Sequence, residues 1–358
     1  MPSDINPYRF SFGPWNLSEG ADPFGPPVRE PLNFAEKLKI AKQLGFDAMQ
    51  YHDDDAVPDL NNLMPAQIAE KARAMKRLLT DHGLACEFIA PRLWEDPRTI
   101  DGAYTSNNPA ERAYAIERTL KAVDIANEMD CHLMVLWLAR EGTYIRESKS
   151  VPDSVSRLID AINKVLEHDK QIRILIEPKP NEPMDQAYIP TVGHGLALGQ
   201  GSADPARVGI LIETAHQILA GLDPSDEMGF ALSFNKLWSV HLNDQNGLKF
   251  DEDKSFGEVD LRRAFNQVRV LDEHGYGKKG EYVGLDVKAM RTQRKGLAMK
   301  HLANSKETFL WLLEKVRTLD RKLQSELINQ RDYEELNRYI TAHLLSVPYS
   351  RSGVAPRN

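Results

Sequence analysis

Stretches rich in β-branched and aromatic residues alternate along the chain with stretches whose apolar residues recur every three or four positions. The first kind is typical of strands buried on both faces of a parallel sheet, and the second of amphipathic helices. Strands are expected over residues 9–15, 46–52, 84–90, 131–138, 172–177, 207–213, 236–242 and 281–286, and helices over 110–129, 152–168, 258–273 and 300–318, among others. Eight strand–helix units in series predict an α/β fold, the (β/α)8 TIM barrel.

The chain extends beyond these eight units. Its last residues hold two polar helical patterns, RKLQSELINQ and YEELNRYITAHLL, and an irregular end. We expect one barrel domain over residues 1–320 and a short helical tail over 321–358 that packs on the barrel or on a neighbouring subunit. A doubly wound open sheet is the rival fold, but it would be expected to carry GxGxxG after its first strand, where this chain has FGPWNL.

The composition and charge of the chain disfavour several classes of protein. The net charge of −7, with both signs interspersed, disfavours nucleic-acid binding. No apolar run reaches the roughly 18 residues of a membrane span, and the N-terminus has no hydrophobic signal core. Cys86 and Cys131 cannot form a disulfide framework. We therefore expect a cytoplasmic protein with two buried, reduced thiols and a small-molecule substrate.

Acidic residues and a histidine end four neighbouring predicted strands, where a barrel of this kind carries its chemistry. The strands end in Glu177, Glu213, His241 and Asp286. Carboxylates are poor strand formers and costly to bury, and two of them a few ångströms apart repel by up to about 4 kcal/mol at a dielectric of 20. A divalent cation would remove that penalty. The alternative is a salt-bridged network around Lys179 and Lys288.

A second group lies close by in the sequence. His216 follows Glu213 by three residues, and Asp251 and Asp253 stand two apart in the loop after the seventh strand. Carboxylates with one imidazole suit Mg²⁺, Mn²⁺ or Co²⁺. If Glu213 bridges, both groups together form a two-metal centre.

Other candidate groups follow the strand ends. His52 and Asp55, in YHDDD, have the pattern of a proton-transfer imidazole oriented by a carboxylate, although a polar loop with a capping aspartate would look the same. Lys179 can point a fixed cation into the same pocket. Trp15, Trp94 and Trp137 lie at or near strand ends; tryptophan usually packs in a core, but here an apolar wall of a sugar pocket is the better interpretation.

Several motifs resemble those of xylose isomerases of the shorter actinobacterial type. They occur in the family's order between about residues 8 and 318: FSFGPW, DPFG, YHDDDAVP, IEPKPNEP (identical to the family over seven residues), TVGHGLAL, the ExxH of IETAHQILAGL, LNDQNGLKFDEDKSFG and LDVK. The resemblance implies a metal-dependent aldose–ketose isomerase that converts D-xylose to D-xylulose, with D-glucose to D-fructose as a second conversion, through ring opening and a 1,2-hydride shift.

The resemblance also implies residue roles. His52, supported by Asp55, assists ring opening, and the Lys179 cation stabilises substrate O1. Two divalent ions (Mg, Mn or Co) are implied, one at Glu177, Glu213 and Asp286 and the other at Glu213, His216, Asp251 and Asp253. Trp15 and Trp137 form the apolar wall, and Phe24 reaches in from a neighbouring subunit of a homo-tetramer or homo-dimer. The Glu182–Pro183 peptide bond is cis by the same resemblance.

Three positions depart from the family pattern. His241 stands where the family has an aspartate, the fourth ligand of the first metal, and this loss of a negative charge should favour Mn²⁺, Co²⁺ or Fe²⁺ over Mg²⁺. A histidine here resembles L-rhamnose isomerases and ketose 3-epimerases. Ala90 replaces a threonine, and Trp94 replaces a phenylalanine. Another aldose, a ketose 3-epimerase working by proton transfer, and a non-catalytic sugar-binding barrel therefore stay open as alternatives.

Overall fold

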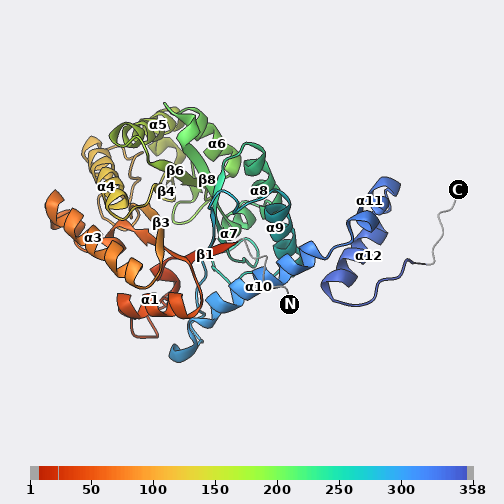
Figure 1. Ribbon diagram of the computed structural model, residues 1–358. Helices are drawn as coiled ribbons and strands as arrows, with labels where there is room; N and C mark the ends of the chain where they lie inside the picture. The colour runs from red at the N-terminus through yellow and green to blue at the C-terminus, as the bar shows by residue number, and fades with distance from the viewer. Residues whose placement is uncertain (1–7, 23, 353–358) are drawn as a thin grey trace.

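Eight parallel strands close into a barrel with helices packed around its outside (Figure 1). The computed structural model describes residues 8–22 and 24–352. The predicted (β/α)8 fold is confirmed. The barrel strands, in chain order, are β1 Arg9–Phe12, β2 Ala48–His52, β3 Ala85–Ala90, β4 Leu133–Trp137, β6 Arg173–Glu177, β8 Val208–Glu213, β9 Leu237–Leu242 and β10 Tyr282–Leu285, and β1 closes the barrel by pairing with β10.

Each expected strand is present, but several are shorter than their hydrophobic runs. The largest difference is at β1, which ends at Phe12 although strand was expected to residue 15. Pro14 begins a 3₁₀ turn, Pro14–Asn16, because its fixed φ suits the first position of a helical turn and it has no N–H for the ladder. Trp15 therefore lies just beyond the strand. A short antiparallel pair outside the barrel, β5 Gly142–Thr143 and β7 Gln186–Ala187, was not predicted.

One long helix follows each barrel strand and covers the outside of the barrel. These helices are α1 Phe34–Gln43, α3 Pro65–Asp81, α4 Pro109–Glu128, α5 Val151–His168, α6 Val192–Gln200, α8 Pro224–Ser233, α9 Leu261–Glu273 and α10 Lys300–Arg317. Two short helices, α2 Asp53–Ala56 and α7 Thr214–Leu219, begin directly at the ends of β2 and β8. They turn the chain at once, so that side chains three residues past a strand end stay close to it.

Strand register brings the predicted site residues to one level. Trp137 pairs with Glu177, and Glu213 pairs with His241, across neighbouring strands. The layer beneath contains apolar side chains from five strands: Phe88, Val135, Leu175, Leu211 and Trp238. Because side chains alternate along a strand, the residue two positions after an interior leucine also faces the interior. Glu177 and Glu213 follow Leu175 and Leu211 in this way.

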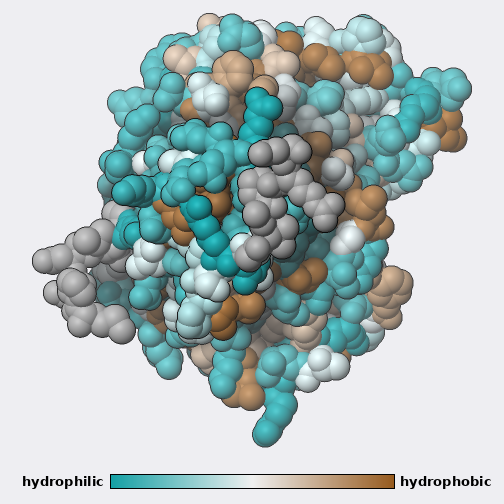
Figure 2. Space-filling model, turned by 90° about the vertical axis from the view of Figure 1, so that its right-hand side faces the viewer, coloured by the Kyte–Doolittle hydropathy of each residue, from teal (hydrophilic) through white to brown (hydrophobic). Residues whose placement is uncertain are grey.

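The chain continues past the eighth unit into α11 Arg321–Gln330 and α12 Tyr333–Leu344, which match the two predicted polar helices. Figure 1 places them beyond the end of α10. Lys315 of α10 donates to the His343 carbonyl (2.8 Å), and Arg262 of α9 donates to Thr341 (3.3 Å). Figure 2, which faces this side of the molecule, shows a mainly hydrophilic surface with separate hydrophobic patches. The division into a barrel domain and a tail stays a prediction.

Three further sequence expectations concern local features. The Glu182–Pro183 bond is cis, as the resemblance implies. Both cysteines are free, but only Cys131 is buried, whereas Cys86 is half-buried. Among the described residues, no helix combines the length and the apolar character needed to cross a bilayer.

Candidate metal centre

The ends of β6, β8 and β9 bring Glu177, Glu213 and His241 into one buried group. The Nδ1 atom of His241 lies 3.6 Å from Glu177 Oε1 and 3.7 Å from Glu213 Oε2. Asp286 stands at the edge of this group, with its Oδ2 3.8 Å from the same nitrogen. The other oxygen of Asp286 accepts a hydrogen bond from Trp15 Nε1 at 2.9 Å. The four predicted strand-end residues therefore converge.

A second group shares Glu213 with the first. His216 Nε2 lies 3.2 Å from Glu213 Oε1 and 3.2 Å from Asp251 Oδ2. Asp253 is buried beside this group, where its carboxylate pairs with the Lys288 ammonium. Of the seven predicted metal ligands, five thus form two compact groups that meet at Glu213, and the other two lie at their edges.

Lysines pair with the loop aspartates but not with the strand glutamates. Lys179 Nζ lies 2.8 Å from Asp251 Oδ2, and Lys288 pairs with Asp253. Within residues 8–22 and 24–352, no lysine or arginine forms an ion pair with Glu177 or Glu213. The salt-bridged alternative therefore accounts for the loop and leaves the two buried strand carboxylates without a cationic partner other than histidine.

The unpaired atoms of the two groups suit a divalent cation. His241 Nδ1, Asp251 Oδ1 and His216 Nδ1 are buried and have no hydrogen-bond partner. The last of these lies 3.7 Å from Glu177 Oε1. A buried polar atom without a partner costs about 1–3 kcal/mol. Carboxylate oxygens and imidazole nitrogens are the donor set of Mg²⁺, Mn²⁺ or Co²⁺ sites. The residues present therefore fit a divalent metal ion.

The charges of these groups interact strongly. Burial raises the pKa of Glu213 well above its usual range, and Asp251 and Asp286 add to the shift. Burial, with help from Asp251, raises the pKa of Asp253 to about 8. Burial acts the same way on Glu177, but His241 and His216 outweigh it and the net pKa is lowered. Without a cation, the centre therefore keeps protons that a bound metal would displace.

Asn243 holds the centre together and was not predicted from the sequence. Its side-chain nitrogen donates to Glu213 Oε1 at 3.0 Å and to Asp253 Oδ1 at 3.3 Å. Its side-chain oxygen accepts from the Ala215 backbone N–H at 2.8 Å. One amide thus links both candidate ligand groups to the start of α7. In the sequence it is a single asparagine two residues past His241, and no motif marks it as part of the site.

His52 and Asp55 form the predicted pair, with Nδ1 of the ring 2.9 Å from Asp55 Oδ2. Arg92, which the sequence did not single out, approaches the same nitrogen: its Nη2 lies 2.7 Å from His52 Nδ1 and 3.3 Å from Asp55 Oδ1. A protonated Nδ1 can donate to Asp55, and an unprotonated one can accept from Arg92. Burial opposes ionisation of Asp55, but His52 and Arg92 outweigh it and lower its pKa.

A cavity of about 420 Å³ opens over the metal-ligand groups. The predicted tryptophans line it: Trp15 lies against His52 with ring centroids 4.3 Å apart, and Trp94 packs edge-on against Trp137 at 4.6 Å. Lys179, Arg92 and Arg140 bring cationic groups to the same cavity. Phe24 does not line it: the side chain is 80% exposed, next to Phe250. Its predicted role in a neighbouring subunit stays untested.

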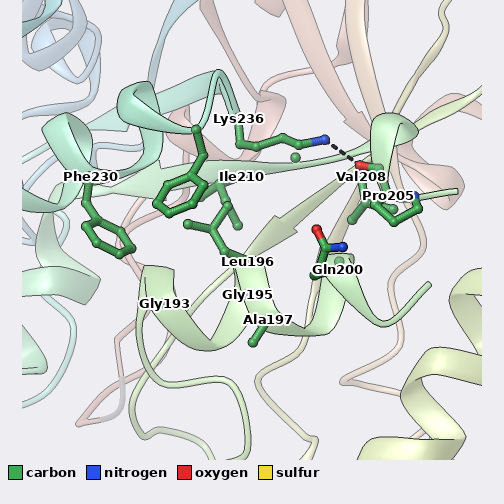
Figure 3. A pocket seen from close by; sticks show the side chains of 13 residues that line it. Gly193, Gly195, Leu196, Ala197, Gln200, Pro205, Val208, Ile210, Phe230 and Lys236 are labelled. Carbon is green, nitrogen blue, oxygen red and sulfur yellow. Dashed lines mark hydrogen bonds between the residues drawn. The ribbon is translucent and has the colours of Figure 1, made fainter.

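A second cleft of similar volume, about 420 Å³, lies outside the barrel between α6, β8 and α8 (Figure 3). Small residues of α6 form one side, and Phe230 and Phe234 line another part of it. Among the described residues, one titratable side chain lines it, Lys236, and its ammonium bonds to the Pro205 carbonyl. With that ammonium bound to a backbone carbonyl, and with no carboxylate or imidazole among the described residues that line it, this cleft offers no chemistry comparable to that of the metal-ligand groups.

Comparisons with known proteins agree with the fold and with the motifs. Residues 38–307 match the family described as xylose isomerase-like TIM barrel, so the chain belongs to that family. A xylose isomerase of Thermus thermophilus is 33% identical over 313 residues, which are 86% of this chain and 80% of that relative.

Solved structures show a similar fold at lower identity. A D-tagatose 3-epimerase-like protein is 17% identical with a TM-score of 0.60, covering 86% of this chain and 99% of that one. A D-psicose 3-epimerase from Clostridium cellulolyticum is 14% identical with a TM-score of 0.57, covering 86% and 98%. At these identities the likeness concerns the fold alone.

Proposed function

We propose that this member of the xylose isomerase-like TIM barrel family is a metal-dependent isomerase that interconverts an aldose and its ketose, with D-xylose as the first substrate to test. The observation that carries the proposal is a pair of buried ligand groups joined at Glu213 in the floor of a sugar-sized cavity. The His52 imidazole, which has Asp55 as its carboxylate partner, and the buried Lys179 ammonium both line the same cavity.

Ring opening needs a group that moves a proton between the anomeric hydroxyl and the ring oxygen. His52 lines the cavity, and its Nδ1 atom contacts Asp55 on the side away from it. Asp55 holds the ring orientation, so Nε2 is the nitrogen left for the sugar. Arg92 can serve as donor when Nδ1 has lost its proton. This arrangement lets His52 act as acid or base without turning.

Glu177, Glu213, His241 and Asp286 would hold one divalent ion, and Glu213, His216, Asp251 and Asp253 the second. A bound divalent cation supplies Lewis-acid polarisation of sugar oxygens, which lowers the cost of charge that develops on them. The protein contributes the fixed positions of these ligands: each lies on a strand end or on the first turn after it, except for the two loop aspartates.

Lys179 contributes a permanent positive charge to the cavity, beside Asp251 of the second ligand group. Burial works against the charged form, but Asp251 and Glu213 outweigh it and raise the pKa of Lys179 above its usual range. The ammonium also lies 5.1 Å from the centre of the Trp137 ring. A sugar O1 placed beside it would gain negative charge at low cost. Trp15, Trp94 and Trp137 would cover the apolar face of the sugar and exclude water.

An NMR assay in D₂O tests the proposal. Purified protein with Mn²⁺ or Mg²⁺ is given D-xylose, D-glucose, D-ribose and L-rhamnose in turn, and a chelator-treated sample serves as the control. We expect ketose that carries no deuterium at C1 and that forms only with metal. Hydrogen that passes from C2 to C1 within the sugar does not exchange with D₂O. Deuterium at the reacting carbon would contradict it and favour a proton-transfer epimerase. No turnover of any aldose would refute the aldose–ketose assignment.

A further inference from the structure

A buried carboxylate lies inside the barrel beneath the candidate metal centre. Glu87 of β3 is 3% exposed, and among the described residues no lysine, arginine or histidine pairs with it. It is stabilised by hydrogen bonds instead: it accepts from Ser239 Oγ at 2.8 Å, from Gln50 Nε2 at 3.0 Å and from Ser11 Oγ. A buried carboxylate is costly unless hydrogen-bonded in this way, and nothing in the proposed reaction uses it.

Gln50 connects this carboxylate to the metal centre. Its side-chain nitrogen donates to Glu87, and its side-chain oxygen lies 3.1 Å from His241 Nε2. The orientation of an amide has to be assigned from its partners. Glu87 already accepts from Ser11 and Ser239, so the NH₂ group of Gln50 faces Glu87 and the carbonyl oxygen faces His241.

The orientation of Gln50 then determines the state of the histidine. An amide oxygen accepts only, so His241 Nε2 must carry a proton and donate it to Gln50. In the neutral ring, Nδ1 is left with a lone pair, and Nδ1 is the atom that faces Glu177, Glu213 and Asp286 without a hydrogen-bond partner. The nitrogen that can bind a metal is therefore the one directed at the other ligands.

The neighbouring strand leaves room for this contact. Gly284 of β10 pairs with His241 of β9. A Cβ atom at residue 284 would lie 2.5 Å from Gln50 Nε2, 2.5 Å from the Val240 carbonyl oxygen and 3.1 Å from His241 Cδ2. A side chain there would press on the β9 backbone, the amide and the imidazole at once, so the glycine leaves the space in which Gln50 and His241 meet.

We infer that Gln50, oriented by Glu87, is a positioning residue that keeps His241 Nε2 protonated and directs Nδ1 to the first divalent cation. The inference rests on the proposed metal centre and deepens it. It concerns side chains behind the cavity wall: His241 lines the cavity, Gln50 contacts His241, and Glu87 contacts Gln50. Partners of this kind typically change metal affinity by about 10- to 100-fold when removed.

Mn²⁺ binding to purified protein tests the inference, with free Mn²⁺ measured by electron paramagnetic resonance. Gln50→Leu and Gln50→Met each remove the acceptor, and both are expected to weaken binding at the first site by about 10- to 100-fold. Ser239→Ala is the matched control, because it removes a hydrogen bond to Glu87 without touching Gln50. Affinity within threefold of wild type in both Gln50 variants, provided they fold, would overturn the inference.

A double-mutant cycle separates positioning from a general loss of structure. In a His241→Asp background the new side chain carries no N–H for the Gln50 oxygen, so Gln50→Leu and Glu87→Met should no longer weaken Mn²⁺ binding. An equal loss in both backgrounds would mean that Gln50 acts only through stability, and would refute the proposal. Urea unfolding of each variant gives the stability directly. If wild-type protein binds no divalent cation at all, the proposed function fails, whereas loss-free Gln50 variants of a metal-binding wild type refute the inference alone.

Discussion

Metal binding is expected to release protons, and Asp253 should account for one of them. The carboxyl is buried beside Asp251, and its pKa is raised to about 8. Below this pH the metal-free protein holds a proton on Asp253, which a cation has to displace before the carboxylate can bind. The sign follows: affinity rises as the pH rises toward 8, and it falls as the pH is lowered.

The magnitude comes from the size of the shift. The pKa of Asp253, about 8, lies well above the usual aspartate range although the Lys288 ammonium opposes the shift, so near neutral pH a proton competes with the cation for this carboxylate. Each pH unit below this pKa lowers the ionised fraction of Asp253 in the metal-free protein by about tenfold. The apparent Mn²⁺ affinity should therefore fall at least about tenfold for each pH unit below 8. Protons leaving His216 and His241, whose pKa values are also raised, would make the slope steeper.

Isothermal titration calorimetry at pH 6.5, in two buffers with different ionisation enthalpies, counts the protons released per Mn²⁺. Asp253→Asn should bind more weakly and release one proton fewer than wild type. Asp124→Asn serves as the control, because Asp124 lies on α4 and pairs with His168, away from the metal centre. It should leave the number of protons released unchanged. A wild-type affinity that is independent of pH between 6 and 7.5 would refute the reasoning, and so would an unchanged proton count in Asp253→Asn.

Three further expectations concern single residues. His241→Asp should shift metal preference toward Mg²⁺, because it restores a negative oxygen ligand; competition of Mg²⁺ against Mn²⁺ measures this. Lys179→Met should lower kcat by more than about 100-fold, because it removes the charge proposed to stabilise O1. Mn²⁺ affinity should not fall, because the same change frees Asp251 Oδ2 from a competing ammonium. Burial lowers the pKa of His301 to about 4, so protonation favours the unfolded chain and stability should fall by about 3 kcal/mol as the pH drops from 6.5 to 4. Urea unfolding of wild type and His301→Gln at both pH values checks the difference.

The sequence predicted the barrel and most of the site because both depend on short-range patterns. A buried parallel strand is a nearly continuous apolar run, so a charged residue at its end, such as Glu177, is visible without knowing the fold. His216 was found because it is three residues from Glu213 on one helical turn. The short pair β5–β7 was missed because two-residue strands have no periodicity. β1 was predicted three residues too long because its apolar run continues past Pro14, where the chain already turns.

Residues that act through distant partners could not be found in this way. Arg92 follows a strand end like any loop arginine, and only the fold brings it within 2.7 Å of His52. Gln50 and Glu87 are 37 residues apart, and each stands in a run that indicates no more than a buried strand. Their contact depends on the register of β2 against β3, which shifts between Met49 and Tyr51. Hydrophobic periodicity carries no information about such a register.

The departure at residue 241 and the polar interior beneath it are chemically linked. An aspartate at this position would present oxygen to the Gln50 oxygen, and two acceptors facing each other in a buried site are unfavourable. Histidine instead presents the Nε2–H to Gln50 and the Nδ1 lone pair to the candidate metal site, so it satisfies both. Histidine at residue 241 is therefore matched to the side chains of the barrel interior as well as to the candidate metal site. Metal preference should then respond to Gln50 and Glu87, whereas sugar preference should respond to Trp94 and Ala90.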